Sequence, residues 1–417
     1  MADGKLEAYL ELAEEAYKKR DMINLTEYSG KIIDMDKTNT LGWFYGGVGA
    51  TFAMSVVEPN EALDLTLKCW EQALYHCDTK TSRESMVEMI NEEYQLMISS
   101  YIDMALSNAI KNPNSARKYS DYFNNFYPKA IMGTVQLSKA MQLKNHDEPL
   151  DVYLDIPHYP YDVWENEFRN LEHRFNSVVA RGSLTESFGN LLLSYIHCFS
   201  LFNFVTGATM TPGDQVQAYT RTISVLNDAK VSLSRRFGSV SLDATSALVE
   251  MISAPLNVAT KNLPKARVEA YWEQHPEEKE ALEKEQEELD DKSDEATKAA
   301  KEKTDAFNAI KKEMEQPTEE ENAFNSAEDE LQKMKNELAK LGIFQGKRKK
   351  ELRAQIPQVE ERNKELYDKA MNSRAQKNSL YAERLSAAQA EMKAAVSEKQ
   401  RIETRLDEIN QKLETGA

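Results

Sequence analysis

The chain has 417 residues, a formal net charge of −17 at pH 7 and an isoelectric point near 5.0. This negative charge argues against general binding to nucleic acid or to an anionic membrane surface, because both are polyanions. Only 15 glycines and 12 prolines are present, and turn-rich β folds need both at their turns, so the composition favours an all-α fold.

The cysteines and the first residues indicate a cytoplasmic protein. Cys69, Cys77 and Cys198 are too few, and odd in number, for a framework of disulfides. The first residues show no basic stretch followed by an apolar core, so no secretory signal is recognised. We therefore expect a reducing, cytoplasmic setting.

Residues 1–148 are predicted to form a domain of short to medium helices joined by polar turns. Leu6, Leu10, Ala13 and Tyr17 recur at the spacing of one helix face. The segments that follow repeat this alternation of apolar helix faces and polar turns, which predicts successive helices packed on one another.

The beginning of this domain resembles the tetratricopeptide repeat, a helix–turn–helix unit of about 34 residues. Leu12-Ala13 stands where that family has a large residue followed by a small one, and residues 36–39 (Asp-Lys-Thr-Asn) stand where it closes with Asp-Pro-x-Asn. Trp43 then begins the next unit, where the family favours tryptophan. Lys37 departs from the family by replacing its proline. The resemblance implies a curved helical array whose concave face holds a peptide or a partner helix.

A connector at 149–161 is predicted to separate the first domain from a second helical domain at 162–261. Pro149, Pro157 and Pro160 fall within this short stretch. Three prolines so close together preclude a continuous helix, because each lacks a backbone N–H and restricts the residue before it.

The second domain contains an uncharged run, residues 187–213, which is long enough to span a bilayer. Asn190, Ser194, His197 and Asn203 recur along it at helical spacing. Such a polar stripe predicts a central helix buried between others and hydrogen-bonded to them. Insertion into a membrane is the alternative. The residues that would be buried, or would meet lipid, are Leu192, Ile196, Phe199 and Phe202.

Residues 262–417 are predicted to form a long antiparallel coiled-coil hairpin with its tip near 342–346. Apolar residues follow the 3-4 spacing of a coiled-coil seam, and the seam shifts near Leu385. Two arms joined by so short a loop should run antiparallel, and the numbers of two residues that face each other across the arms should then total about 688. Pro317 with Thr318 and Glu321 predicts a helix restart with a capping box. The seam residues are Phe324, Ala327, Leu331, Met334, Leu338 and Leu341 in the first arm, and Leu352, Val359, Leu366, Leu380, Ala388, Met392, Ala395, Ile402, Leu406, Ile409 and Leu413 in the second.

The predicted turn comprises Gly342, Phe344 and Gly346, in which Gly342 can take the left-handed conformation that ends a helix and Gly346 can supply a second turn. Residues 341–350 also resemble a turn of uncharacterised bacterial helical proteins, in which Leu-Gly, Phe, Gly-Lys and further lysines recur at this spacing. That resemblance implies no function.

The hairpin is predicted to be electrically polarised. Its tip carries five cations, where the dipole of the following helix disfavours positive charge, so they are candidate contacts for an anion or an acidic partner. A solvated basic tip is the plainer interpretation. Eleven acids lie between Glu277 and Glu295 at the other end, so head-to-tail pairing with a second copy is a hypothesis. The tip cations are Lys347, Arg348, Lys349, Lys350 and Arg353.

No catalytic or metal-binding motif is recognised in the sequence. Residues 45–51 are glycine-rich but lack the strand and the lysine of a phosphate-binding loop, so they predict close helix packing instead. His76-Cys77 and His197-Cys198 lack the spacing of zinc ligands, which favours buried thiols. We expect no enzyme, no cofactor, no metal and no small-molecule substrate.

These features predict a non-enzymatic scaffold protein that binds a protein partner through a helical-repeat groove and uses the coiled-coil arm for spacing or self-association. One alternative is a membrane-active helical protein that uses segment 187–213. Another is an enzyme, or a protein that contacts nucleic acid through the basic hairpin tip, although the acidic composition argues against a nucleic-acid partner.

Overall fold

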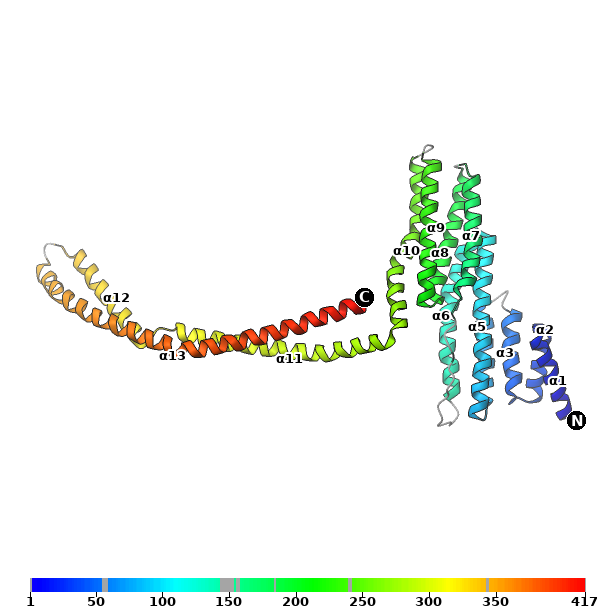
Figure 1. Cartoon of the computed structure of the whole chain (residues 1–417), viewed down its shortest axis with the longest axis horizontal. Helices are drawn as coiled ribbons and strands as arrows, with labels where there is room; N and C mark the ends of the chain where they lie inside the picture. The colour runs from blue at the N-terminus through cyan, green and yellow to red at the C-terminus, as the bar shows by residue number, and fades with distance from the viewer. Residues whose placement is uncertain are drawn as a thin grey trace. The chain divides into compact units, whose positions relative to one another are not determined.

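The computed structural model describes residues 2–54, 59–142, 154, 158–183, 185–238, 242–342 and 345–416. In this described part the chain forms thirteen α-helices and one 3-10 turn, without a β-strand, which confirms the all-α class (Figure 1). The chain divides into two compact units, Met1–Gln274 and His275–Ala417. The predicted boundary between residues 261 and 262 therefore lies inside a helix of the first unit, and the hairpin begins at His275 instead.

Helices of the first unit pack around one continuous apolar core that extends from α1 to α10. The helices α1 to α4 pack each on the next in chain order, whereas α8 is central and packs against α5, α6, α7, α9 and α10. The elements are α1 (Ala2–Lys18), α2 (Met22–Met35), α3 (Thr40–Met54), α4 (Pro59–His76), α5 (Lys80–Lys111), the 3-10 turn η1 (Pro113–Ser115), α6 (Ala116–Gln142), α7 (Tyr161–Arg181), α8 (Glu186–Thr209), α9 (Pro212–Phe237) and α10 (Leu242–Gln274).

Local sequence signals set several helix ends in this unit. The Thr79 side chain accepts a hydrogen bond from the Ser82 backbone N–H, which caps the start of α5. Thr211 caps α9 in the same way, and Pro212 occupies the first position of that helix, where a missing N–H costs nothing. Arg20 lies just after α1 and has a left-handed backbone conformation, with a φ of 55°. Its guanidinium pairs with the buried carboxylate of Glu93 at 2.7 Å, which ties the end of α1 to α5.

Most of the predicted connector 149–161 lies outside the described residues. Its described end is anchored in the core by Tyr159, which is fully buried. The backbone N–H of Tyr159 donates to the Thr209 carbonyl at 2.7 Å, and its hydroxyl donates to Asp103. The chain that enters α7 is therefore tied both to the end of α8 and to α5.

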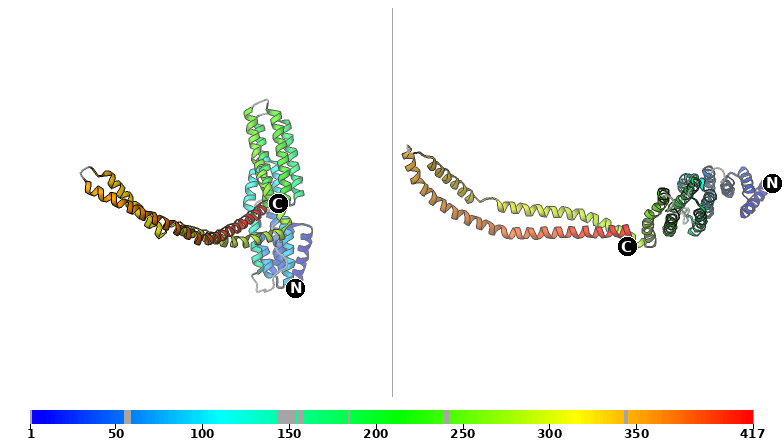
Figure 2. Two further views of the ribbon diagram at one scale, coloured as in Figure 1. Left: turned by 60° about the vertical axis from the view of Figure 1, so that its left-hand side comes forward. Right: turned by 90° about the horizontal axis from the view of Figure 1, so that it is seen from above.

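The second unit is an antiparallel helical hairpin. One arm consists of α11 (Pro276–Glu315) followed by α12 (Glu319–Lys340), and the other is the single helix α13 (Gly346–Thr415). Both α11 and α12 pack along α13, and Figure 2 shows the arms side by side. Hydrogen-bonded and ion-paired residues across the arms have numbers that total between 685, for Glu337 with Arg348, and 697, for Glu313 with Arg384. The predicted total of about 688 falls within this range.

The predicted break before α12 is present with its capping box. The Thr318 side chain accepts from the Glu321 backbone N–H, and the Glu321 side chain accepts from the Thr318 N–H. All six seam residues predicted for the first arm are buried or partly buried, and Ala327 and Leu331 are the most buried of them. The 3-4 spacing therefore identified the inner face of this arm.

Leu380 is the exception among the predicted seam residues, because its side chain is 69% exposed. The partly buried positions there are Lys377 and Tyr381. Arg374 and Lys377 donate to the Gln316 carbonyl at 3.1 Å and 2.7 Å, so α13 changes its partner helix at this level. The seam therefore shifts before Leu380 rather than after it, and Leu380 is left facing solvent.

Candidate interaction sites

The basic tip lies at the start of α13. Lys347, Lys350 and Arg353 are exposed, and Lys349 is partly exposed. None of these four forms an ion pair within the described ranges, although they follow a helix N-terminus that disfavours cations. They are therefore free to meet an anionic group from outside the hairpin.

Arg348 differs from the other tip cations because it is used inside the hairpin. Its guanidinium donates two hydrogen bonds to the Glu337 carboxylate of α12, at 2.8 Å and 3.1 Å, and lies 3.8 Å from Glu351. The hydrogen bond from Arg348 lowers the pKa of Glu337. This two-point contact fixes the two arms to each other at the tip.

The turn itself forms differently from the prediction. Gly416 is the only described glycine with a positive φ, so Gly342 does not take the left-handed conformation that is open to it. Helix α12 ends instead because Leu341 is extended, with φ −70° and ψ 121°, while its N–H still bonds to the Glu337 carbonyl. Gly346 begins α13 as an exposed residue, and Phe344 lies outside the described residues.

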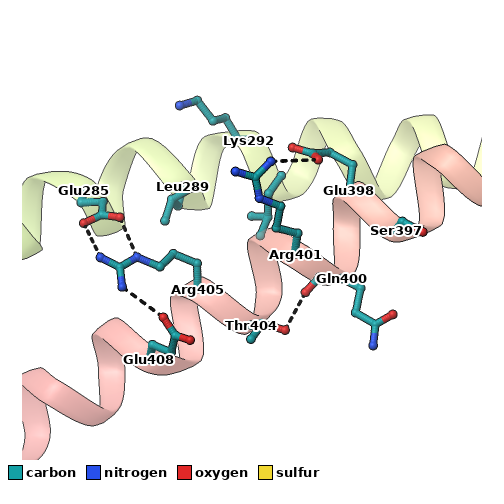
Figure 3. Close-up of a pocket in the computed structure, with 11 residues that line it drawn as sticks. Glu285, Leu289, Lys292, Ser397, Glu398, Gln400, Arg401, Thr404, Arg405 and Glu408 are labelled. Atoms are coloured by element: carbon teal, nitrogen blue, oxygen red, sulfur yellow. Dashed lines mark hydrogen bonds and ion pairs between the residues drawn. The ribbon is translucent and has the colours of Figure 1, made fainter.

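At the opposite end of the hairpin, a shallow depression of about 750 Å³ runs between α11 and α13 (Figure 3). Arg405 donates to both oxygens of Glu285, at 2.8 Å and 3.0 Å, and to Glu408 at 3.1 Å. These contacts raise the pKa of Arg405 and lower that of Glu285. The three charged groups at its centre, Glu285, Arg405 and Glu408, are therefore already paired with one another.

A second depression, of about 500 Å³, lies between α8, α9 and α10 in the first unit. None of its lining side chains carries a charge at neutral pH, and Val258 on its wall is 45% exposed. Apolar walls with a few polar groups are typical of binding sites. The lining residues are Ser200, Asn203, Phe204, Gly207, Ala208, Tyr219, Ala254, Pro255, Val258 and Asn262.

Three polar side chains hold the walls of this depression together. The Asn203 amide donates to the Pro255 carbonyl at 2.8 Å, and its buried Oδ1 accepts no hydrogen bond from any described residue. Asn262 donates to the Tyr219 hydroxyl at 3.4 Å. Gly207 leaves room for that hydroxyl, because a Cβ at Gly207 would lie 2.9 Å from it. This site was not predicted from the sequence, because its residues come from three helices and only the lack of charge on α8 hinted at it.

The uncharged segment forms the buried central helix that was predicted. Leu192, Phe199 and Phe202 are fully buried, and Ile196 is 4% exposed. The Ser194 hydroxyl, on the polar stripe, donates to the Asn114 side chain at 2.5 Å. Within the described ranges, α8 alone has the length and hydropathy that a membrane-crossing helix requires.

The cysteines considered for chemistry are packed into the core, whereas the neighbouring His76 and His197 are half-buried. All three cysteines are buried, and burial raises the pKa of Cys69 to about 11 and that of Cys198 to about 12, which makes them poor nucleophiles at neutral pH. In the glycine-rich stretch, a Cβ at Gly47 would lie 2.5 Å from Trp70 Nε1, as expected for close helix packing. The described residues contain no group of three or more His, Cys, Asp or Glu side chains placed to hold a metal ion.

Comparison of the chain with protein-family models, with curated proteins and with solved structures finds no match. The resemblances to tetratricopeptide repeats and to the bacterial hairpin turn therefore stay predictions.

Proposed function

We propose that the protein is a non-enzymatic interaction protein, in which the helical unit binds an apolar segment of a partner protein and the hairpin serves as a charged arm. The observation that carries this proposal is the uncharged depression between α8, α9 and α10. It exposes Val258 at its wall and leaves the Oδ1 of Asn203 without a hydrogen-bond donor among the described residues.

The chemistry of the depression suits a partner side chain better than a reaction. Tyr219 is its one lining group with an acidic proton, and burial raises the pKa of that hydroxyl above its ordinary value of 10.0. General acid–base catalysis at neutral pH needs a group that titrates near neutrality. An apolar side chain of a partner can fill the space beside Val258, because no charged group lines it.

The tetratricopeptide resemblance of the first helices supports the same class of function, because that family's arrays hold peptides and helices. The cytoplasmic setting predicted from the cysteines belongs to the same proposal. The hairpin adds length: the 70 residues of α13 correspond to about 105 Å at 1.5 Å per residue.

Two matched variants test the proposed groove. Val258→Asp places a charge on the wall of the depression, whereas Val231→Asp changes a residue of α9 that is 48% exposed and lies outside it. Both should fold, because both sites face solvent. The full-length chain and both variants are used to capture partners from a lysate of the native host, with nuclease and elevated salt.

A partner retained by the wild type and by Val231→Asp, but bound at least tenfold more weakly by Val258→Asp in calorimetry with the purified partner, is the expected result. Equal binding by the two variants would remove the depression as the site. Turnover of a substrate by the purified chain, abolished by one pocket substitution, would refute the non-enzymatic proposal. Binding that disappears with nuclease would favour nucleic-acid contact at the tip.

Membrane activity is a second candidate because α8 is long and apolar enough to cross a bilayer. It requires α8 to leave the core, where 61% of its most apolar window is buried. Flotation with anionic and zwitterionic vesicles decides between the two candidates. Wild-type protein that stays at the bottom of the gradient removes the membrane candidate, and protein that floats would support it.

A further inference from the structure

The two ends of the hairpin carry opposite and largely unneutralised charge. Of the eleven acids between Glu277 and Glu295, three form ion pairs within the hairpin: Glu278 with Lys412, Glu283 with Lys279 and Glu285 with Arg405. The other eight are exposed and form no ion pair with any described residue. Residues 330–356 at the tip contain eight basic side chains and three acidic ones.

The middle of the hairpin exposes an apolar side chain. Leu380 is 69% exposed, more than any other large hydrophobic residue described in this unit. It lies thirty residues after Lys350 and thirty before Asn410 on the continuous helix α13. Leu380 therefore marks the midpoint between the basic tip and the acidic end, at roughly 45 Å from each.

We propose that a second copy of this chain packs alongside the hairpin in antiparallel orientation. Leu380 of each copy lies at the two-fold axis, and the basic tip of each copy meets the acidic segment 277–295 of the other. The two-fold axis at Leu380 places Lys350 of one copy at the same height along the rod as Asn410 of the other copy. Asn410 accepts a hydrogen bond from Gln286 of α11 at 2.7 Å within its own hairpin, so this level lies inside the acidic segment.

The charge pattern favours this arrangement over the other ways of pairing two rods. A parallel pair would place tip against tip and acidic end against acidic end, where like charges repel. End-to-end pairing would join one tip to one acidic end, would leave Leu380 in water and would propagate into open filaments. In the antiparallel pair, both basic tips and both acidic ends face opposite charge. The pair closes as a dimer, because neither end is left to bind a third copy.

The dimer should be sensitive to salt and to the sign of the tip charge. Sedimentation equilibrium of the full-length chain at low salt should give a dimer, with association at least tenfold weaker in 1 M salt, where the Debye length falls to about 3 Å. Reversing the four free tip cations should also weaken association at least tenfold. Arg348 is kept because it pairs with Glu337. The reversed variant is Lys347→Glu, Lys349→Glu, Lys350→Glu and Arg353→Glu.

Reversing exposed acids in the tip-reversed chain should restore the dimer, because each tip again meets opposite charge. This rescue distinguishes charge pairing between copies from damage to the fold. A wild-type chain that stays monomeric at low salt and high concentration, or a rescue variant that stays monomeric, would overturn the proposal. The acids to reverse are Glu287→Lys, Glu288→Lys, Asp290→Lys and Asp291→Lys.

Cysteine cross-linking tests the orientation, and the three native cysteines do not interfere because they are buried. Leu380→Cys should form a disulfide-linked dimer on mild oxidation. A mixture of Lys350→Cys and Asn410→Cys chains should cross-link, whereas Lys350→Cys alone should not. Self-cross-linking of Lys350→Cys would show a parallel pair, and failure of Leu380→Cys would remove the two-fold axis from this residue; either result overturns the proposal. The partner capture by the groove at Val258 is independent of these outcomes.

Discussion

Gly47 on α3 offers a sharp test of how tightly the first helices pack. Substitution by alanine would place a Cβ 2.5 Å from Nε1 and 2.6 Å from Cδ1 of Trp70 on α4. The indole is fully buried and donates to the Phe44 carbonyl at 3.2 Å, so it has little room to move. Forced overpacking costs about 1–3 kcal/mol, and a disturbed hydrogen bond adds about 1 kcal/mol.

A part of this cost is offset because alanine is the better helix former, by about 0.5–1 kcal/mol. We therefore expect Gly47→Ala to lower the free energy of unfolding by about 1–3 kcal/mol. Gly30→Ala is the matched control. Gly30 is exposed inside α2, with no atom within 4 Å of an added Cβ, so this substitution should stabilise by about 0.5–1 kcal/mol.

Urea unfolding followed by tryptophan fluorescence measures both effects, because all four tryptophans lie between residues 43 and 272 and report on the first unit alone. With a urea slope near 3 kcal/mol per molar, the Gly47→Ala midpoint should fall by roughly 0.3–1 M. A midpoint equal to or above the wild-type value would refute the close approach of α3 and α4. It would also reopen a role for the glycines in binding a ligand.

Further measurements address the central helix and the thiols. Leu192→Asp buries an unpaired charge in α8 and should destabilise by on the order of 4 kcal/mol, whereas Leu191→Asp, at a site 36% exposed, should cost less than about 1 kcal/mol in the same urea assay. A thiol reagent at pH 8 should label no cysteine in the native chain and three after denaturation; fast labelling of the native chain would contradict their burial. Burial raises the pKa of Cys69 to about 11 and that of Cys198 to about 12. As pH rises, these thiols therefore lose their protons in the unfolded chain before they do so in the folded chain. Unfolding free energy should therefore fall as pH rises from about 9 toward 11, and it should fall less in Cys198→Ala.

Much of the hairpin could be predicted from the sequence because its contacts are periodic. The 3-4 spacing of Ala327 and Leu331 identified the face that is buried, and the short loop fixed the direction in which the arms pair. Thr318 and Glu321 predicted the capping box because a cap depends on residues only three apart. For the same reason of local spacing, the uncharged run was correctly interpreted as a buried central helix.

Contacts between distant segments decided the rest. Leu380 keeps the heptad spacing but faces solvent, because α13 changes its partner helix beside Gln316 and the seam shifts there. Gly342 permits a left-handed end to α12, but Leu341 ends it in an extended conformation instead. The depression around Asn203 joins side chains of α8, α9 and α10, whose proximity has no local periodicity. Sequence spacing thus determined which face of each helix is buried, whereas the packing of helices far apart in the chain decided where the surface is left open for a partner.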